Sequence, residues 1–302
     1  MTVKTLFFLG KGGTGKSTAS ALVSLVLMQK GKKVLLASFD DAHNQGDIFQ
    51  ETFTDKACTL GPCLEVLQVD RDKEIQAYLA KTADRVKAGY TYLTAFNLDN
   101  YFDILKFSPG MEEYALVTAF MGLWDRYNAY DYLVIDMPPT ALSMRFFNLP
   151  ALSLTWVEHL EKLRKEINDR KEIISRIKFA GKAFERDRIL KRIHEIKADY
   201  LHMNTIFNDP AQASFYAVVN EDRLSVAETG RIIEQLAGLS ISLKAVICNN
   251  RGTTTGTGDQ PFEDHFPSLP VGKIPFSESP LIGMDALQAH IRAHDLHFDR
   301  LV

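Results

Sequence analysis

The sequence predicts an α/β fold, a doubly wound and mostly parallel β-sheet with a helical subdomain, formed by one domain over residues 1–302. Two observations predict this class. Short, wholly apolar runs alternate with segments of helical spacing, and a glycine-rich loop joins the first such run to the first helix. With 46% apolar and 24% charged residues, the chain has the composition of a globular protein that can bury a sizeable core.

The N-terminal part of the chain contains one complete strand–helix–strand unit. Apolar runs at residues 3–9 and 34–39 flank residues 17–30, whose apolar positions recur at helical spacing. Because a crossover helix joins parallel strands, these two strands are predicted to be parallel. Further buried strands are predicted, in chain order, at residues 64–69, 132–136, 214–219, 244–248 and 271–274. Runs that are apolar throughout indicate a sheet covered on both faces, with its ligand at the carboxyl ends of the strands.

Two stretches interrupt this alternation and form the predicted helical subdomain, at about residues 72–128 and 155–202. The second stretch keeps one apolar face and has 13 Lys/Arg against 8 Asp/Glu between residues 158 and 197. That excess is either a solvated helix face or a docking surface for an acidic partner. Aromatic and methionine residues in the first stretch fit either ordinary core or an apolar groove: Tyr78, Phe96, Tyr101, Phe102, Met111, Phe120, Met121 and Trp124.

Charge and cysteine content narrow the possible functions. The net charge of −3 provides no basic field, so we expect no nucleic-acid partner. The three cysteines, Cys58, Cys63 and Cys248, fit a reducing cytoplasm, where we expect the protein to act. No signal peptide is recognisable at the N-terminus, and no run of about 18 apolar residues predicts a transmembrane segment.

The glycine-rich loop has the spacing of a phosphate-binding loop. Gly10, Gly15, Lys16 and Ser17 match Gly-x4-Gly-Lys-Ser, after a predicted strand and at the start of a predicted helix. Glycines let backbone N–H groups turn towards phosphate oxygens, and the helix N-terminus adds its positive dipole end. We predict that Lys16 reaches the β- and γ-phosphates of a nucleotide and that the Ser17 hydroxyl ligates Mg²⁺. The nucleotide-binding residues expected in this loop are Gly10, Lys11, Gly12, Gly13, Thr14, Gly15, Lys16, Ser17 and Thr18.

A second lysine, Lys11, lies inside the loop, although one lysine suffices for the phosphates of the same chain. It is either a solvated loop residue or a cation that contacts nucleotide held by another subunit, as an arginine finger does in trans. The second interpretation makes the loop one half of a shared site.

Two aspartates end predicted strands beside the loop. Asp40 can orient an attacking water or join the Mg²⁺ shell, and Asp136 ends Tyr-Leu-Val-Ile-Asp, the usual form of a Walker B carboxylate. Pro138 and Pro139 follow Asp136. Because prolines fix φ and remove two donors, they predict a stiff segment that could swing as a unit when the γ-phosphate leaves.

Together these motifs resemble the ArsA-type ATPases. Residues 11–18 resemble the deviant Walker A of the ParA/MinD/ArsA branch, which is marked by its signature lysine. Residues 40–44 are similar to the Asp-Pro-Ala-His-Asn/Ser switch I of this family, and residues 136–150 are similar to its switch II. The resemblance runs in order from Phe7 to about Leu287 and is weakest in the two helical stretches.

The resemblance implies a Mg²⁺-dependent ATPase, with ATP or ADP bound in a nucleotide-sandwich homodimer. It implies that Lys11 of one subunit meets the phosphates held by the other, and that Asp40 positions the hydrolytic water. Asp40, Lys16 and Lys11 are then the catalytic residues, and Ser17 and Asp136 hold the metal, Asp136 through a water molecule. Further nucleotide contacts are expected from Asn44 and, at the adenine, from Asn249, Pro275 and Phe276.

The sequence departs from the family pattern at two places. Asp41 stands where the family has proline, which puts a second carboxylate beside Asp40 and could retune Mg²⁺ binding or slow hydrolysis. Ala141-Leu142 replaces the Gly-His of switch II, so coupling to the helical subdomain could differ.

Cysteine and histidine positions do not indicate a metal centre. The ArsA-type family includes arsenite-pump ATPases and the targeting factor for tail-anchored membrane proteins. The zinc-binding Cys-x-x-Cys of the targeting factors is absent here, and Cys58-x4-Cys63 lies away from the position of the metalloid thiols in the arsenite pump. We expect these cysteines in the core or at a strand edge. His290, His294 and His297 share one predicted helical face, which we interpret as the polar face of a terminal helix.

The role expected from these features is a switch that couples ATP turnover to binding and release of a client protein, with a membrane-associated partner also possible. Two alternatives are an energising subunit of an anion or metalloid efflux pump and a ParA/MinD-like positioning ATPase. The cysteines argue against the first, and the C-terminal residues 286–302, with little membrane character, argue against the second. A GTPase is disfavoured because no guanine-recognition motif is present.

Overall fold

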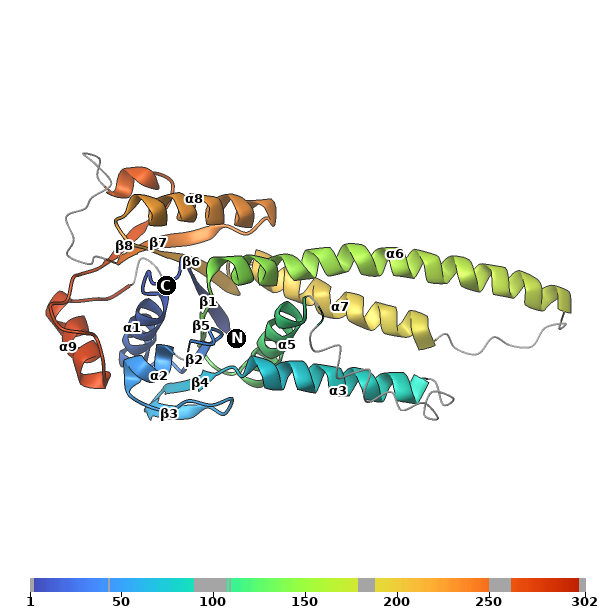
Figure 1. The fold of residues 1–302 in the computed structure, drawn as a ribbon, viewed down its shortest axis with the longest axis horizontal. Helices are drawn as coiled ribbons and strands as arrows, with labels where there is room; N and C mark the ends of the chain where they lie inside the picture. Colours follow the sequence, from blue (N-terminus) through green and yellow to red (C-terminus); the bar gives the residue numbers. More distant parts are fainter. Residues whose placement is uncertain are drawn as a thin grey trace.

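The structure is a computed structural model that describes residues 3–42, 44–89, 108, 110–178, 188–249 and 262–298. Its centre is one eight-stranded sheet with the order β3-β4-β2-β5-β1-β6-β7-β8 (Figure 1). Neighbouring strands are parallel except for the β3–β4 pair at one edge. The strands are β1 Lys4–Leu9, β2 Val34–Ser38, β3 Cys58–Gly61, β4 Leu64–Gln68, β5 Tyr132–Asp136, β6 Ala213–Val219, β7 Leu243–Asn249 and β8 Val271–Ile274.

The predicted fold class is confirmed, and all seven expected strands form within a residue or two of their predicted ends. The strand that sequence analysis did not predict is β3, a short antiparallel edge strand whose residues are all at least partly exposed. Its four residues, Cys-Thr-Leu-Gly, lack the apolar run that identified the others, because an edge strand needs no complete apolar covering.

Helices cover both faces of the sheet and also extend beyond it. The helices next to the sheet are α1 Lys16–Gln29, α2 Asn44–Phe49, α5 Met111–Arg126, α8 Arg223–Gly238 and α9 Met284–His294, with a short 3₁₀ turn at Phe262–His265. Three longer helices, α3 Arg71–Gly89, α6 Thr140–Lys178 and α7 Arg188–Asn208, project together away from the sheet (Figure 1). We call the paired helices α6 and α7 the arm.

Alternate side chains of the central strand enter two separate cores. Phe8 points to the face covered by α1 and α9, where it packs with Leu22, Tyr216 and Ile291. Phe7 points to the opposite face, where the helices of the subdomain begin. There its ring lies 5.0–5.6 Å, centroid to centroid, from four other phenylalanines, Phe120, Phe147, Phe207 and Phe215. Because these come from α5, α6, α7 and β6, the aromatic cluster anchors the arm to the sheet.

Helices α3 and α5 lie within the first predicted helical stretch and α6 and α7 overlap the second, but α6 begins earlier than the predicted start of that stretch. Helix α6 starts at Thr140 instead of near residue 155 and continues through Pro150. Proline in a helix interior removes a backbone hydrogen bond and usually kinks or ends the helix. Here Phe146 and Phe147, one turn earlier, are buried against the sheet and hold the helix across the proline.

The aromatic and methionine residues of the first helical stretch, residues 72–128, were expected to form either ordinary core or an apolar groove. Phe120, Trp124 and Met111 are buried, so these residues form core and not an open groove. Phe96, Tyr101 and Phe102 lie outside the described residues. Exposed apolar side chains occur instead on α6, where Leu152, Trp156 and Leu163 lie on one face of the helix.

Charged side chains join the two helices of the arm. Glu161 on α6 contacts Lys165 at 2.5 Å and Lys197 of α7 at 3.2 Å, and Lys197 also contacts Glu158 at 3.4 Å. The two lysines hold the pKa of the Glu161 carboxyl down to about 2. This arm network, which also includes His194, shows that part of the local charge is a solvated helix surface.

The C-terminal histidines differ from expectation. Helix α9 ends at His294, and Asp295 adopts a left-handed conformation, so His297 does not share the helical face. His290 is buried and packs against His294 with a centroid separation of 4.5 Å. No cluster of three potential metal ligands occurs among the residues that the structure describes. In the same part of the chain, no helix is both long and apolar enough to cross a bilayer.

Candidate nucleotide-binding site

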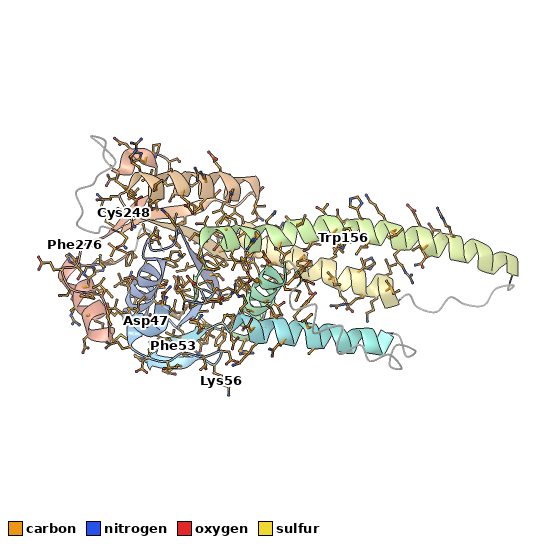
Figure 2. The ribbon with its side chains drawn as sticks, viewed as in Figure 1. Asp47, Phe53, Lys56, Trp156, Cys248 and Phe276 are labelled. Atoms are coloured by element: carbon orange, nitrogen blue, oxygen red, sulfur yellow. The ribbon has the colours of Figure 1, made fainter. Side chains whose placement is uncertain are left out.

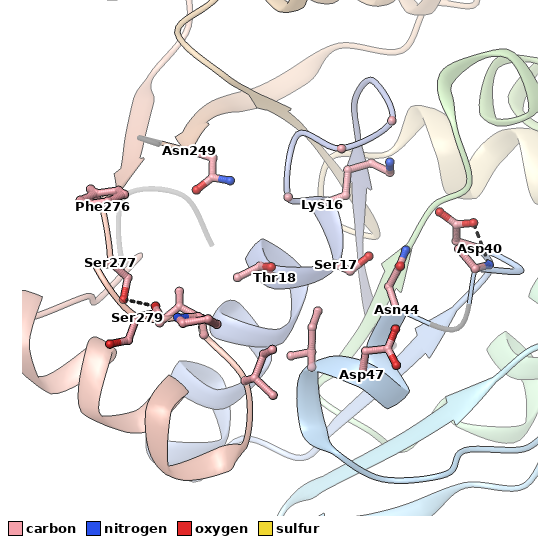
Figure 3. A pocket seen from close by; sticks show the side chains of 18 of the residues that line it. Lys16, Ser17, Thr18, Asp40, Asn44, Asp47, Asn249, Phe276, Ser277 and Ser279 are labelled. Carbon is pink, nitrogen blue, oxygen red and sulfur yellow. Dashed lines mark hydrogen bonds between the residues drawn. The ribbon is translucent and has the colours of Figure 1, made fainter. Parts of the chain in front are cut away.

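A pocket of about 900 Å³ opens at the carboxyl end of β1 (Figure 3). The segments that follow β1, β2, β5 and β8 and the last residue of β7 contribute to its walls, as expected for a ligand site in an open α/β sheet. The predicted site residues in its lining are Gly12, Gly13, Gly15, Lys16, Ser17, Thr18, Asp40, Asn44, Asn249, Pro275 and Phe276.

Two glycines are required for the shape of the loop between β1 and α1. Gly10 has φ of 146°, and a Cβ atom there would lie 2.4 Å from the carbonyl oxygen of Val218. Gly15 has φ of 90°, and a Cβ there would lie 2.3 Å from Asn249 Nδ2. Both positive φ values and both close approaches exclude any larger residue. The loop therefore packs directly on strands β6 and β7, with its backbone free to face a ligand.

The two lysines of the loop occupy different positions. Lys16 is the first residue of α1, is buried, and its Nζ lies 3.4 Å from the carbonyl oxygen of Lys11. Lys11 is half-buried and does not line the pocket, although its carbonyl also accepts a 2.9 Å hydrogen bond from Thr14 Oγ1. Thr14 is itself buried, so it supports the loop instead of facing the cavity.

A buried polar cluster lies directly beneath the loop. Asp136, at the end of β5, is inaccessible to solvent, and its Oδ2 accepts a 3.0 Å hydrogen bond from Gln45 Nε2. The same Gln45 nitrogen lies 3.1 Å from the Ser17 carbonyl oxygen and 3.0 Å from Ser20 Oγ. Gln45 was not predicted as a site residue, because it follows Asn44 in a short helix and only tertiary packing brings it to Asp136. We call Ser17, Ser20, Gln45 and Asp136 the buried cluster.

The environment of Asp136 is unfavourable for a negative charge. Burial raises the pKa of its carboxyl to about 6, against the opposing effects of hydrogen bonds from Ser17 and Gln45 and of the nearby Lys16 charge. Its second oxygen, Oδ1, and Gln45 Oε1 are both buried and have no hydrogen-bond partner within the described part of the chain. A buried oxygen without a partner is uncommon and indicates that a ligand or water completes the site.

The donor set of this cluster fits a magnesium ion. Mg²⁺ prefers oxygen ligands and usually keeps several of its waters, so a hydroxyl and a carboxylate near phosphates suffice. Ser17 lines the pocket, and the unpartnered Asp136 Oδ1 lies behind it without lining the pocket itself. That arrangement is consistent with a metal bound through a water at Asp136.

The segment after β2 forms the wall of the pocket near Lys16 (Figure 3). The Asp40 Oδ1 atom accepts a 3.2 Å hydrogen bond from the Ala42 backbone N–H, and its backbone carbonyl accepts a 2.9 Å bond from Gln68 Nε2 of β4. Asp40 is only partly buried and faces the pocket, so a water molecule can reach its carboxylate. His43 lies outside the described residues.

The opposite end of the pocket is less polar. Asn249 Nδ2 donates a 2.9 Å hydrogen bond to the Thr14 carbonyl, which fixes the amide at the end of β7 beside the loop. Pro275 and Phe276 follow β8 and line the same region. The lining of the whole pocket also contains residues that the sequence did not predict, namely Ala42, Asp47, Ile48, Pro139, Ser277, Ser279, Pro280, Leu281 and Ile282. A 2.7 Å hydrogen bond from the Gly283 N–H to the Ile48 carbonyl closes the wall against α2.

The cysteines lie in different parts of the sheet. Cys58 begins β3 and Cys63 lies in the turn before β4, as expected for strand-edge residues, whereas Cys248 is buried in β7 on the other half of the sheet. Burial raises the pKa of the Cys248 thiol to about 12, so it is not predisposed to act as a thiolate ligand. The described structure therefore contains no cluster of thiols for a metalloid.

Fold and pocket together define a P-loop nucleotide-binding protein. The loop after the central strand opens α1 at the carboxyl edge of a mostly parallel sheet, with Lys16, Ser17 and two strand-end aspartates beside it. Comparison with known families defines the class further. Residues 3–256 match the family described as anion-transporting ATPase (ArsA ATPase), and the chain belongs to this family. Family membership implies nucleotide binding and supports ATP hydrolysis.

Individual relatives carry two kinds of name. The chain is 29% identical to "Putative arsenical pump-driving ATPase 2" of Aquifex aeolicus over 82% of this chain and 80% of that protein. It is 25% identical to "ATPase ASNA1 homolog" of Cryptosporidium parvum over 93% of this chain and 76% of the relative. It is 27% identical to "ATPase GET3" of Mycosarcoma maydis over 82% of this chain and 72% of that protein.

Proposed function

We propose that this protein binds ATP with Mg²⁺ and hydrolyses it as a cytoplasmic homodimeric switch that binds and releases a client protein. The observation that supports it most is the position of Lys16 and Ser17 in the pocket, directly above a buried Asp136 with an unpartnered oxygen. This combination suits a phosphate chain and its metal better than it suits an uncharged ligand.

Each residue near the phosphates has a proposed role. Lys16 neutralises charge on the β- and γ-phosphates, and Asp40, which a water molecule can reach, orients the attacking water. Ser17 and Asp136 would hold Mg²⁺, which when bound supplies positive charge to the phosphate oxygens. Asn249, Pro275 and Phe276 contact the adenine, and Asn44 completes the wall near Ser17.

The dimer proposal rests on Lys11. Its side chain is half-exposed and lies outside the pocket lining, while Lys16 occupies the position that serves the phosphates of the same chain. A cation held at the rim of the loop can meet the phosphates of a facing subunit, where it would stabilise the charge that develops during hydrolysis.

The client proposal rests on the outer face of α6. Leu152, Trp156 and Leu163 are 62%, 64% and 53% exposed, and they lie on one face of the helix. Figure 2 shows Trp156 on the arm, well away from Phe276 in the nucleotide pocket. A large apolar group exposed on a projecting helix is typical of a binding surface. The names of the relatives "ATPase GET3" and "ATPase ASNA1 homolog" do not state a client, and its identity is left open.

A second candidate is an energising subunit of an anion pump, which the name of the Aquifex relative favours. One experiment separates the two. The Asp40→Asn variant, loaded with ATP so that it binds without hydrolysing, is incubated with cell extract and its bound proteins are identified. We expect soluble or membrane proteins bearing an exposed apolar helix, recovered with ATP and not with ADP. Recovery of a single membrane pump subunit would favour the second candidate, and recovery of DNA alone would contradict both.

The ATPase activity itself is tested by phosphate release from the purified wild-type protein, with and without EDTA. We expect release that depends on Mg²⁺. Nucleotide binding without any hydrolysis, under conditions in which dimers form, would contradict the enzymatic part of the proposal.

A further inference from the structure

An arginine at the start of α3 lies between two carboxylates from different parts of the fold. The Arg71 Nη2 atom pairs with Asp41 Oδ2, in the segment after β2, and its Nη1 lies 3.2 Å from Glu112 Oε2, in the first turn of α5. The guanidinium is 25% exposed, and the two carboxylates are 45% and 49% exposed. Since Asp41 directly follows Asp40, this arginine connects a wall of the nucleotide pocket to the subdomain.

The neighbouring residue of α5 makes a second connection. Glu113 is largely buried, and its Oε1 lies 2.5 Å from Arg145 Nε of α6. Arg145 lies in the second turn of α6, shortly after Pro138 and Pro139, and Pro139 lines the pocket. The segment after β5 is therefore also connected to the first turn of α5.

Both connections meet at two consecutive residues, so a displacement of one is transmitted to the other through one helical turn. We call Asp41, Arg71, Glu112, Glu113 and Arg145 the charged bracket. The chain between β2 and β5 contains α3 and α5, and the bracket joins the start of each helix to a strand-end segment at the pocket.

The chemistry of the bracket depends on arginine. The planar guanidinium presents several N–H donors in a fixed geometry, so one side chain can bond two carboxylates that approach different nitrogens. Asp41 needs such a partner, because burial and the charges of Asp40 and Glu112 raise the pKa of its carboxyl and Arg71 opposes them. Proline, which the related switch segments have at this position, could not form the pair.

From this geometry we propose that Arg71 is a positioning residue, which ties the Asp40–Ala42 segment to α5 and, through Glu113 and Arg145, to α6. The inference rests on the proposed ATPase function and extends it to the route from the pocket to the arm. Arg71 does not line the pocket, so it acts on hydrolysis through the position of Asp40 and not by contact with the nucleotide.

The test uses the full-length protein and two readouts. ATP hydrolysis is measured for wild type, Arg71→Gln, Arg71→Lys and Glu112→Gln, and amide hydrogen exchange of α5 is compared with ADP and with a non-hydrolysable ATP analogue. For Arg71→Gln we expect kcat to fall about five- to ten-fold while the KM for ATP changes less than about two-fold, because binding contacts are untouched. The nucleotide-dependent change in α5 exchange should be reduced, because only the Glu113–Arg145 contact then connects α5 to the pocket. Arg71→Lys should be intermediate, since a lysine can keep one of the two contacts.

A matched control and a second variant exclude a general loss of structure. Lys73 lies on the same helix and pairs with Asp55 at 3.1 Å, so Lys73→Gln removes an exposed ion pair outside the bracket and should leave both readouts unchanged. Glu112→Gln breaks the α5 contact without touching the switch segment and should reduce the exchange response to the same extent as Arg71→Gln. Combining Asp41→Asn with Arg71→Gln should reduce kcat no further than Arg71→Gln alone.

Two results would overturn the inference while leaving the ATPase function intact. The first is a wild-type protein that hydrolyses ATP with no nucleotide-dependent change in α5. The second is an Arg71→Gln variant whose α5 hydrogen exchange responds to nucleotide as in wild type and whose kcat lies within about two-fold of wild type. A wild-type protein that neither binds nor hydrolyses ATP would instead contradict the proposed function. It would also contradict the inference that the charged bracket couples the pocket to the arm.

Discussion

The buried cluster beneath the phosphate loop and the arm network hold carboxylates in opposite environments. Asp136 has no exposure to solvent, has an oxygen without a partner in the described structure, and has its pKa raised by burial to about 6. Glu161 lies between the two helices of the arm with 14% of its side chain exposed, and Lys165 and Lys197 satisfy it and lower its pKa to about 2. The Asp136 carboxylate destabilises the protein when no ligand is bound, whereas the Glu161 carboxylate already has its charged partners.

This difference indicates where function is located in the molecule. A group that opposes folding and lacks a partner is explained by a ligand that supplies one, as phosphate-bound metal would at Asp136. A surface ion pair that is already satisfied contributes little to stability because solvent screens it. Changes at the buried cluster should therefore alter activity strongly, and changes in the arm network should alter almost nothing.

The largest effect is expected at Lys16. Replacing it in Lys16→Ala removes the cation nearest the phosphates, and phosphate release should fall by about 100-fold or more. The matched control is Lys32→Ala, a change of an exposed lysine in the same strand–helix–strand unit, which should keep wild-type activity. Equal activity in the two variants would contradict the assignment of the phosphate site.

The second prediction concerns Asp136 and separates stability from activity. Asp136→Asn removes a buried charge, and its amide oxygen can still accept the hydrogen bond from Gln45 Nε2. In the nucleotide-free protein with EDTA, we expect the free energy of unfolding to rise by about 1–3 kcal/mol near pH 8, while ATP hydrolysis is lost.

The pH dependence of that gain has a definite sign. Because the folded-state pKa of Asp136 is raised to about 6, the folded protein binds this proton more tightly than the unfolded chain does. Its contribution to stability is therefore lost as pH rises from about 4 to about 6, and the advantage of Asp136→Asn should shrink towards zero near pH 4. Chemical denaturation of both proteins across this pH range measures the difference in their free energies of unfolding. A difference that does not change with pH would contradict the buried-charge explanation.

Local motifs made much of the fold and site predictable. The strands, the phosphate loop, Asp40 and Asp136 depend on short apolar runs and on residues next to one another in the chain. Much of the loop and Asp40 line the pocket, and Asp136 is buried behind Ser17. Gln45 and Arg71 were missed because their partners, Asp136 and Glu112, are distant in sequence and meet only through packing.

Other features were hidden by competing local signals. The second helical stretch was predicted to start near residue 155, yet the phenylalanines before Pro150 pack on the sheet and α6 begins at Thr140. The periodic spacing of His290, His294 and His297 suggested a common face, but α9 ends before the last of them. Tertiary contacts decided both cases, and no pattern within the segment records those contacts.

A smaller effect is expected on the arm surface. Trp156→Ser removes an exposed apolar anchor, so recovery of the ATP-dependent client by the Asp40→Asn trap should fall about five- to ten-fold. Thermal stability should not change, because the side chain is 64% exposed. The control is Leu224→Ser on α8, a similarly exposed apolar residue that is not part of the arm. If both variants reduced recovery equally, the outer face of α6 would not be the client surface.

The smallest effect is expected in the arm network. Glu161→Gln breaks the contacts with Lys165 and Lys197, but we expect the melting temperature to fall by no more than about 2 °C and ATP hydrolysis to stay at the wild-type level. A large fall in either quantity would mean that the arm network, like the buried cluster, has a function that depends on charge.

The central claim is that the phosphate loop forms half of an ATP site shared between two subunits, and subunit mixing tests it most directly. Lys11→Ala and Asp40→Asn should each be inactive alone. If Lys11 acts on the nucleotide of the facing subunit, a mixed dimer contains one intact site, formed by Asp40 of the first variant and Lys11 of the second. Random exchange should then restore about a quarter of wild-type hydrolysis, since half of the dimers are mixed and each has one working site. A mixture as inactive as its two components would contradict the shared site.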